Sequence, residues 1–295
     1  MHLTSGLRCA KVIPVKASAG VDARKAHPGD RMAIEALCDR ARYKLPQMWH
    51  WEEHLDAEPF VVVENAKSLE GVIFAWPDGS PVAWVRTAAL GHGLGMDAWL
   101  DLSLPLVLAA LRRSGASALA WMDYGGWVEE HLEKRGFRPL TDVVTLSKFG
   151  RNLPAPSPCS ADVRPASDAD VPAAAVVDRA AFTAPWWYSE DTMRRRAGRA
   201  AYFAVATLAG EVVGYAEGEL RLPVAHLNRI AVHPAHQGRG VGAALLRDAL
   251  RAFWRQGAGY VTLNTQSDNV YSQRLYRRFG FEATGDFATV WELEI

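Results

Sequence analysis

Residues 229–243 read RIAVHPAHQGRGVGA. The apolar run 230–232 predicts a strand that stops before Pro234, since proline cannot donate to a strand ladder. Alternate glycines follow, and apolar residues at helical spacing then predict a helix over 241–256. A strand, a glycine turn and a helix N-terminus in this order direct several free N–H groups at one point, so the turn suits an anion.

Two common phosphate-binding loops do not fit this turn. A dinucleotide fingerprint needs glycines directly after the strand and an acid about 20 residues later. Here residues 233–238 intervene, and residues 257–265 contain no acid. A GxxxxGK[ST] loop requires a lysine that does not follow here. A glycine turn that binds nothing is the remaining structural alternative.

Residues further along the chain favour an acyl-CoA site. Gln237, Gly240 and Gly242 are followed by Asn269, by Tyr276 and then by a Gly-Phe pair at 280–281. This order resembles the GNAT acetyltransferase superfamily, whose pattern is [Arg/Gln]-x-x-Gly-x-[Gly/Ala], an Asn, and a Tyr seven residues later just before Gly-Phe. The resemblance implies an α/β fold (α+β by some conventions) with a mixed, mostly antiparallel sheet flanked by helices.

Composition sets the class of protein. A length of 295 residues exceeds one typical domain, and 49% hydrophobic content supports large cores. Net charge is zero, so no nucleic-acid partner is expected, and no apolar run spans a membrane. Lys11 and Lys16 interrupt any signal peptide. The three cysteines, Cys9, Cys38 and Cys159, suit neither a disulfide framework nor a zinc site, so we expect a cytoplasmic protein. We expect it to be a monomer or a homodimer.

A faint repeat divides the chain into two copies. Residues 22–30 (DARKAHPGD) align with 162–170 (DVRPASDAD), and 135–137 align with 279–281. Alternating prolines between the copies predict a stiff linker. The predicted parts are a loose extension over 1–21, a degenerate GNAT-like domain over 22–149, the linker over 150–161, and an acetyl-CoA-binding catalytic GNAT domain over 162–295.

Periodicity predicts the elements of the second copy. Asp170 and Ser189 are the expected N-caps of its first two helices. Helices are expected over 170–182, 189–197, 241–256 and 269–279, and strands over 202–208, 212–220, 226–232, 260–264 and 289–294.

The first copy keeps the pattern of the fold and loses the pattern of the site. In alignment, Ala98 and Leu100 stand where Gly240 and Gly242 stand, and Leu132 replaces Tyr276. We expect a half that contributes packing and one wall of the acceptor site. The alternative is a second acetyl-CoA site built from Gly91, Gly93 and Gly95.

Acetyl-CoA is the donor that the resemblance implies, with no metal. Its pyrophosphate would lie on the N–H groups of the glycine turn, and its pantetheine arm would pair with strand 230–232 as another strand would. In the family, an N–H of this strand also faces the thioester oxygen. Asn269 resembles the asparagine that binds the pantetheine arm, although it also suits a helix cap. The predicted acetyl-CoA contacts are Ile230, Ala231, Val232, Gln237, Gly238, Arg239, Gly240, Val241, Gly242, Ala243, Asn264 and Asn269.

Tyr276 resembles the general acid of the family, which protonates the leaving CoA thiolate; a helix residue packed on the sheet is the alternative. The resemblance leaves the general base open, because family members carry a Glu either at the position of Asn264 or at the position of His226, and an Asn cannot act as a base. We expect His226 to be catalytic, since its pKa suits a base and since the period of two places it on one strand face with Asn228 and Ile230. Glu217, Glu219 and water are the alternatives.

The acceptor is expected to be a primary amine on a small molecule, an aminosugar or a protein N-terminus. Residues 182–189 (FTAPWWYS) carry aromatics that either wall the acceptor pocket or close the core. The tandem layout also resembles mycothiol synthase, and a non-catalytic acyl-CoA-binding regulator is the alternative from another class.

Overall fold

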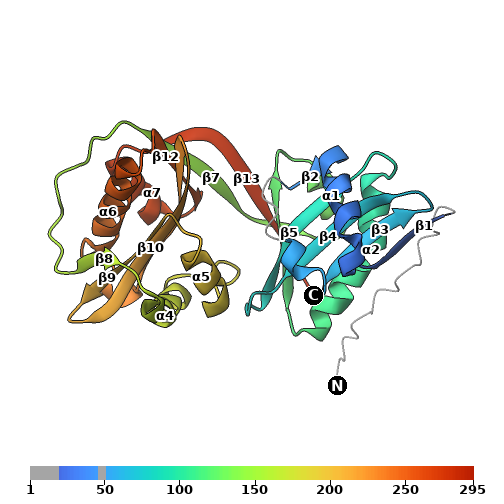
Figure 1. Ribbon diagram of the computed structural model, residues 1–295, viewed down its shortest axis with the longest axis horizontal. Coiled ribbons are helices and arrows are strands. Elements are labelled where there is room, and N and C mark those ends of the chain that lie inside the picture. The colour runs from blue at the N-terminus through green and yellow to red at the C-terminus, as the bar shows by residue number, and fades with distance from the viewer. Residues whose placement is uncertain (1–19, 46–50) are drawn as a thin grey trace, which may run out of the picture.

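The chain folds into two lobes, each with strands flanked by helices (Figure 1). The computed structural model describes residues 20–45 and 51–295, so the predicted extension lies outside it except for Gly20 and Val21. Thirteen strands form one sheet in the order β1-β3-β4-β5-β6-β13-β7-β12-β11-β10-β9-β8, with β2 paired to β5. This is the predicted mixed, mostly antiparallel α/β architecture.

The elements of both lobes follow in chain order. The first copy contains β1 (Val21–Lys25), η1 (Pro28–Asp30), α1 (Arg31–Arg40), β2 (Tyr43–Lys44), η2 (Trp51–His54), β3 (Phe60–Asn65), β4 (Leu69–Trp76), β5 (Val82–Leu90), α2 (Met96–Arg113), β6 (Ala118–Tyr124), α3 (Glu129–Glu133) and β7 (Arg138–Phe149). The second contains β8 (Asp162–Pro165), η3 (Asp168–Asp170), α4 (Val171–Ala181), α5 (Glu190–Ala197), β9 (Tyr202–Leu208), β10 (Glu211–Arg221), β11 (Val224–Val232), η4 (Pro234–His236), α6 (Val241–Arg255), β12 (Tyr260–Gln266), α7 (Val270–Arg278) and β13 (Glu282–Glu294).

The repeat is visible in the first turn of each copy. Asp30 accepts hydrogen bonds from Arg24 at 2.7 and 2.8 Å, and Asp170 accepts bonds of the same lengths from Arg164. Each aspartate also accepts the backbone N–H three residues earlier and closes a capping box around a short 3-10 turn. Asp170 is the N-cap residue of α4, as predicted, but its side chain makes no capping hydrogen bond to that helix, because the carboxylate turns back to Arg164 and Ser167. The predicted Ser189 cap is confirmed, with a bond from the Thr192 N–H at 3.0 Å.

The other predicted elements agree with the structure to within about two residues, except for the last strand. β13 begins at Glu282, whereas the sequence predicts a start at residue 289. Residues 282–287 are exposed and lack the apolar alternation of a half-buried strand, although Glu282 and Ala283 already pair with β7.

The last strand of each copy crosses to the other lobe. β7 pairs with β12, from Tyr260 opposite Phe149 to Gln266 opposite Val143. β13 pairs with β6, from Ala288 opposite Tyr124 to Glu294 opposite Ala118, and also with β7. These two long strands bridge the lobes (Figure 1). We call this arrangement the strand exchange.

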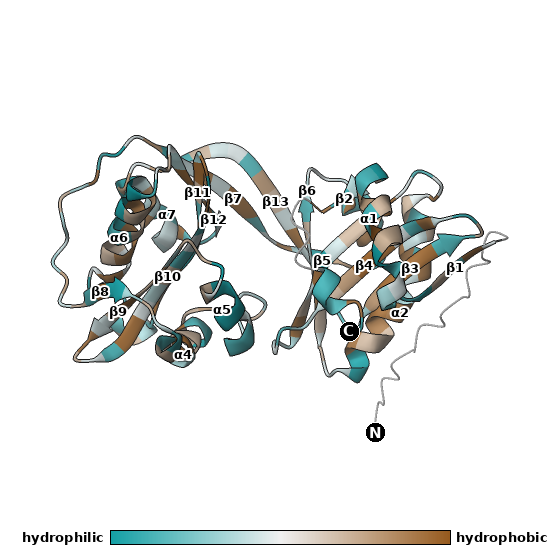
Figure 2. Cartoon of the chain, in the orientation of Figure 1, coloured by the Kyte–Doolittle hydropathy of each residue, from teal (hydrophilic) through white to brown (hydrophobic). Residues whose placement is uncertain are grey.

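Apolar residues are frequent along the strands, and polar residues are frequent along the helices (Figure 2). The buried apolar residues form two core clusters in each lobe. A smaller core joins the two lobes. It contains Val82, Trp84, Ala118, Ala120, Val143 and Val290, with Trp186 of the second copy packed against it. The Trp84 Nε1 donates to the Pro185 carbonyl at 2.9 Å, and the Trp84 and Trp186 rings lie 5.3 Å apart. The loop after α4 is thus held against the first lobe.

Candidate functional site

Two neighbouring parallel strands separate in the middle of the second lobe. β11 and β12 pair from Val224 opposite Tyr260 to Leu227 opposite Leu263, and no further. Beyond this point β11 stays paired with β10, while β12 stays paired with β7. The edge of β11 that faces the gap therefore presents backbone N–H and C=O groups over residues 228–232. Such an edge suits an extended, amide-rich ligand.

A β-bulge at Asn228 shapes this gap. Gly218 pairs with Leu227 and Glu217 pairs with Arg229, so Asn228 is the extra residue. The bulge changes which side chains of β11 point into the core that contains α6. Before the bulge Leu227 belongs to this core, and after the bulge Ile230 belongs to it. The prediction that His226 shares a face with Ile230 is therefore wrong, whereas His226 and Asn228 do face the same side.

The glycine turn (residues 237–243) lies just beyond the end of β11. Gly238 and Gly240 have φ of +74° and +80°, in the left-handed region that favours glycine. Gly240 is the N-cap of α6 and has no side chain to cap the helix, so among the described residues no capping side chain satisfies its first N–H groups. The Gln237 side chain donates to the Val232 carbonyl at 3.0 Å and joins the turn to the strand.

The linker (residues 150–161) packs along α6 and α7. Arg247 of α6 donates to the Pro154 carbonyl, and Arg278 of α7 donates to the Ala155 carbonyl at 3.4 Å. A Cβ on Gly240 would lie only 2.5 Å from the Pro158 carbonyl oxygen. Gly240 is therefore needed for its backbone conformation and for the close approach of the linker.

The glycines of the first copy hold one of the protein's own carboxylates. The Gly93 N–H donates to the Glu70 carboxylate at 2.9 Å, and Glu70 is buried, with 5% of the residue exposed. A Cβ on Gly91 would lie 2.5 Å from Glu70 Oε2. These glycines thus surround an internal anion, which argues against the alternative of a second acyl-CoA site.

Two cavities lie between the lobes and meet beside the gap in β11 and β12. The smaller has a volume of about 210 Å³ and the larger about 650 Å³. Among the described residues, Arg86, Arg196, His226 and Asn228 line both cavities. Trp84 of the first copy and Trp186, Trp187 and Tyr188 of the second also line the smaller cavity. The aromatics of the 182–189 segment therefore do wall a cavity, as one of the two sequence interpretations has it.

His226 lies where the two cavities meet. Its Nδ1 is 2.8 Å from the Thr262 hydroxyl, which is also 3.4 Å from the Ala225 carbonyl oxygen. A carbonyl only accepts, so the hydroxyl can donate to it while the Nδ1–H donates to the hydroxyl. That tautomer leaves Nε2 with a lone pair. Burial lowers the pKa of His226 below its ordinary value of 6.5, so the ring is neutral at pH 7.

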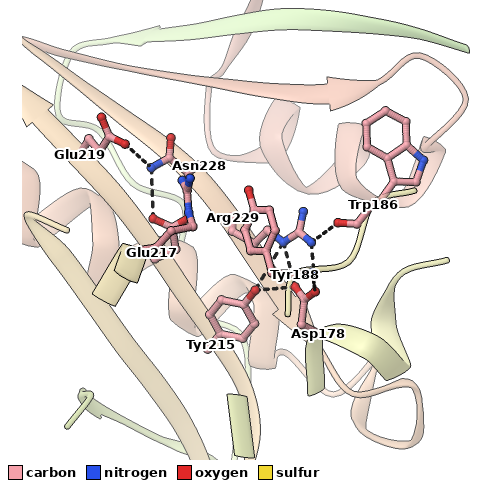
Figure 3. Close-up of polar contacts among 9 residues, drawn as sticks. Asp178, Trp186, Tyr188, Tyr215, Glu217, Glu219, Asn228 and Arg229 are labelled. Atoms are coloured by element: carbon pink, nitrogen blue, oxygen red, sulfur yellow. Dashed lines mark hydrogen bonds and ion pairs between the residues drawn. The ribbon is translucent and has the colours of Figure 1, made fainter. Parts of the chain in front are cut away.

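The two alternative bases are held by other groups. Glu217 is buried, and its carboxylate accepts from Arg196 at 2.7 Å on one oxygen and from Asn228 at 3.1 Å on the other. Glu219 lies 3.4 Å from the same Asn228 amide (Figure 3). Both oxygens of Glu217 are therefore already occupied by side-chain donors.

Tyr276 lies on α7 in the apolar core beneath β11 and β12, with its ring 5.9 Å from that of Phe281. Burial raises the pKa of Tyr276 to about 12, and the charge of Arg229 acts in the opposite direction. The phenol is therefore fully protonated at neutral pH and is a weaker acid than a free phenol. Tyr276 is absent from the described walls of both cavities, so the structure does not bring it together with His226 in one cavity.

The two predicted asparagines occupy different places. Asn264 lines the smaller cavity at the first position where β12 has left β11, and it accepts from the Thr145 hydroxyl at 3.1 Å. Asn269 caps α7 by accepting the Ser272 N–H at 3.1 Å. This cap uses the carbonyl oxygen of the Asn269 side chain, and the amide can still donate to a ligand.

A buried charge network that sequence reasoning missed holds the cavity wall (Figure 3). Arg229 donates to Asp178 at 2.8 and 3.1 Å and to the Trp186 carbonyl, and its guanidinium lies 3.9 Å from the centre of the Tyr188 ring. Asp178 is fully buried and also accepts from Tyr215 at 2.5 Å. Arg229 directly precedes an apolar run, and nothing in the neighbouring sequence indicates that its side chain is buried. The burial is explained by Asp178 on α4, which forms an ion pair with it.

Comparison with known proteins identifies the family of the second copy. Residues 173–281 match the sequence profile of the Acetyltransferase (GNAT) family. The [ribosomal protein bS18]-alanine N-acetyltransferase of Escherichia coli K12 is 32% identical over 116 residues, which is 39% of this chain and 77% of that protein. The chain belongs to the GNAT acetyltransferase family. The matched region is the second copy of this GNAT protein and includes β11, the glycine turn and α7.

Other relatives extend the comparison. The spore coat polysaccharide biosynthesis protein SpsD of Bacillus subtilis is 38% identical over 96 residues, which is 32% of this chain and only 33% of that protein's length. The structure of a tandem GNAT protein from the clavulanic acid biosynthesis pathway superposes with a TM-score of 0.63 at 17% identity. It covers 93% of this chain and 98% of that one, so the likeness in fold spans both copies.

Two kinds of feature are not found in the described part of this GNAT protein. None of the helices in residues 20–45 and 51–295 is long and apolar enough to cross a bilayer. Within the same ranges, no three His, Cys, Asp or Glu side chains are grouped to hold a metal ion.

Proposed function

We propose that the second copy transfers an acetyl group from acetyl-CoA to a primary amine, with no covalent enzyme intermediate. The observation that carries the proposal is that β11 leaves β12 immediately before the glycine turn and the open N-terminus of α6. An amide-rich arm and a pyrophosphate follow one another in acetyl-CoA in the order that this edge and this turn would receive them.

The backbone supplies the donor site in this proposal. The N–H groups of residues 238–243 bind the pyrophosphate, and Ile230, Ala231 and Val232 pair with the pantetheine arm. One N–H of β11 stabilises the oxyanion that forms as the amine attacks the thioester carbon. The Asn269 amide and Asn264 add contacts to the arm. An open space around Gly238, with no atom within 4 Å of a Cβ placed there, fits a ligand at this turn.

The side chains move the protons. The amine arrives as an ammonium ion and gives one proton to His226 Nε2, which the Thr262 hydroxyl leaves free by holding Nδ1. The amine nitrogen then bonds to the thioester carbon. As the C–S bond breaks, the Tyr276 hydroxyl gives its proton to the departing thiolate, the nitrogen releases its second proton to solvent, and the phenolate takes a proton back from solvent, so that the amide and the CoA thiol form with one net proton left on His226. The first copy provides Trp84 and Arg86 as the opposite wall of the acceptor cavity.

Acetyl-CoA binding and turnover test this function. Calorimetry is expected to give one acetyl-CoA per chain, because Glu70 occupies the glycines of the first copy. Thiol release is then measured with amino acids, aminosugars, simple amines and peptides that begin with alanine. Release with any acceptor supports the transferase. Binding without release from the whole panel supports an acyl-CoA-binding regulator, and absence of binding refutes the proposal.

The pH dependence tests His226. Because its pKa is lowered, His226 is expected to stay neutral down to a pH below 6.5, and kcat/KM is expected to fall only below that pH as the ring becomes protonated. His226→Ala should lower kcat by about a hundredfold and abolish this acid limb. The matched control is His92→Ala, an exposed histidine of the first lobe, which should leave the profile unchanged. An acid limb that survives in His226→Ala would assign the base to another group.

A further inference from the structure

The helices that follow the glycine turn carry an excess of positive charge. Residues 239–280 contain seven arginines and no lysine, against two aspartates and no glutamate, although the net charge of the whole chain is zero. The linker, which packs along α6 and α7, contains no aspartate or glutamate either. The surface that α6 and α7 form beyond the glycine turn is therefore cationic and favours an anion.

Three of these arginines lie close together: Arg247 and Arg251 on α6, and Arg278 on α7. Arg247 and Arg251 are one helical turn apart and are neighbours on the helix surface. The Arg247 guanidinium lies 5.7 Å from the centre of the Phe279 ring, next to Arg278 in the chain. Burial lowers the pKa of Arg247, and the like charges of Arg251 and Arg278 lower it further. We call these three residues the arginine cluster.

The linker orients the cluster without neutralising it. Arg247 donates to the Pro154 carbonyl, and Arg278 donates to the Ala155 carbonyl at 3.4 Å. A carbonyl fixes the direction of a guanidinium but brings no charge, and each guanidinium has five N–H donors, so donors remain on both. Among the described residues, none of the three arginines forms an ion pair with a carboxylate, and the exposed Arg251 makes no hydrogen bond. Three like charges therefore stand together without an internal counter-ion.

The cluster lies along the continuation of the proposed donor site. A Cβ on Gly242 would lie 3.5 Å from Leu275 Cδ2, so α7 packs beside the first turn of α6, and the two helices run side by side from there. Arg247 stands about 9 Å along α6 from Val241, at about 1.5 Å per residue. In acetyl-CoA the pyrophosphate joins the pantetheine arm to an adenosine whose ribose carries a phosphate monoester. With the arm on β11 and the pyrophosphate on the glycine turn, this ribose phosphate would come within reach of the long arginine side chains.

We infer that the arginine cluster binds the ribose phosphate of acetyl-CoA, and that the linker orients Arg247 and Arg278 for this contact. The inference rests on the proposed function, since it extends the donor site of the same copy. A phosphate monoester carries about −1.5 to −2 charges at pH 7 and three acceptor oxygens, so it suits several guanidinium groups at once. The segment that joins the two copies thereby takes part in donor recognition.

The test compares CoA with dephospho-CoA, which lacks only the ribose phosphate. Calorimetry gives the Kd of each ligand for the full chain. CoA is expected to bind the wild type about tenfold or more tightly than dephospho-CoA, because hydrogen bonds between charged groups are lost with the phosphate. This ratio of Kd values should shrink at high salt, which screens exposed charges.

Substitutions then assign the phosphate to the cluster. Arg251→Gln and Arg278→Gln should each lower the ratio about threefold or more, and the triple variant that also carries Arg247→Gln should bring it close to one. Arg112→Gln, at an exposed arginine of α2 in the first lobe, is the control and should leave the ratio unchanged. Because both ligands share the arm and the pyrophosphate, the ratio cancels any general change in the donor site or in the packing of the linker.

The possible failures are distinct. Equal Kd values for CoA and dephospho-CoA in the wild type overturn the inference and leave the proposed function standing. A ratio that Arg251→Gln and Arg278→Gln both leave unchanged also overturns it, since the phosphate is then held elsewhere. Arg251 has no hydrogen bond to lose, so this variant should fold even if the loss of linker contacts destabilises the other two. Absence of binding of both ligands instead refutes the proposed function.

Discussion

The Tyr276→Phe variant is expected to turn over at least a hundredfold more slowly than the wild type while binding acetyl-CoA with the same affinity. The hydroxyl is the proposed proton donor to the thiolate, and general acid catalysis contributes about 10²–10⁴-fold. The ring remains in the core of α7, β11 and β12, where phenylalanine fills the same space, so folding should be preserved. Steady-state kinetics gives kcat, and calorimetry gives the acetyl-CoA Kd.

Tyr202→Phe is the matched control. Tyr202 belongs to the same core and its hydroxyl donates to Asp248 on α6 at 2.9 Å, away from β12. Its loss should cost about 1 kcal/mol of stability and leave kcat unchanged. Unchanged kcat in Tyr276→Phe would remove this residue from the mechanism, and an equal drop in both variants would indicate a packing effect.

A negative charge in the glycine turn is expected to raise the acetyl-CoA Kd by about a hundredfold or more. Gly238→Asp places a carboxylate beside the pyrophosphate, where like charges about 4 Å apart repel by about 1–4 kcal/mol. The position has open space around a Cβ, and aspartate tolerates a positive φ better than most residues. Calorimetry at low and high salt measures the effect, which should shrink as salt screens the charges.

Gly238→Asn is the control for this prediction. Asparagine has the same shape and the same tolerance of positive φ, so the difference between the two variants isolates the charge. Gly240→Asp should abolish binding outright, but its Cβ also meets the Pro158 carbonyl, and its loss of binding would not separate the phosphate site from the linker. Equal Kd values for the Asp and Asn variants would show that no phosphate lies at this turn.

Local patterns predicted much of the second copy. The glycine turn, α6 and α7 begin and end almost where periodicity and capping residues place them, because each signal is written in adjacent residues. The Asn228 bulge is different, since it depends on the register of β10 against β11 and no pattern within one strand contains it. That one extra residue separates His226 from the face of Ile230.

The walls of the acceptor cavity were also hard to predict, because they join residues that are far apart in the chain. The 182–189 aromatics were visible in the sequence, whereas Trp84 and Arg86 lie in the copy without a site and meet them only after folding. Buried pairs such as Arg229 with Asp178 join residues far apart in the chain, and charge patterns read along the sequence do not reveal them. The proposed roles of Tyr276, His226 and the donor contacts remain predictions.

The strand exchange also constrains how the protein is made. β6 ends at Tyr124, and its neighbour β13 begins only at Glu282, so the ribosome synthesises the entire second copy before β6 can be paired on that side. Until then a nascent chain presents an unpaired apolar strand edge, which is a site for aggregation. Neither copy expressed as a separate fragment would contain all the strands of its own lobe, and the two lobes should therefore melt in a single transition.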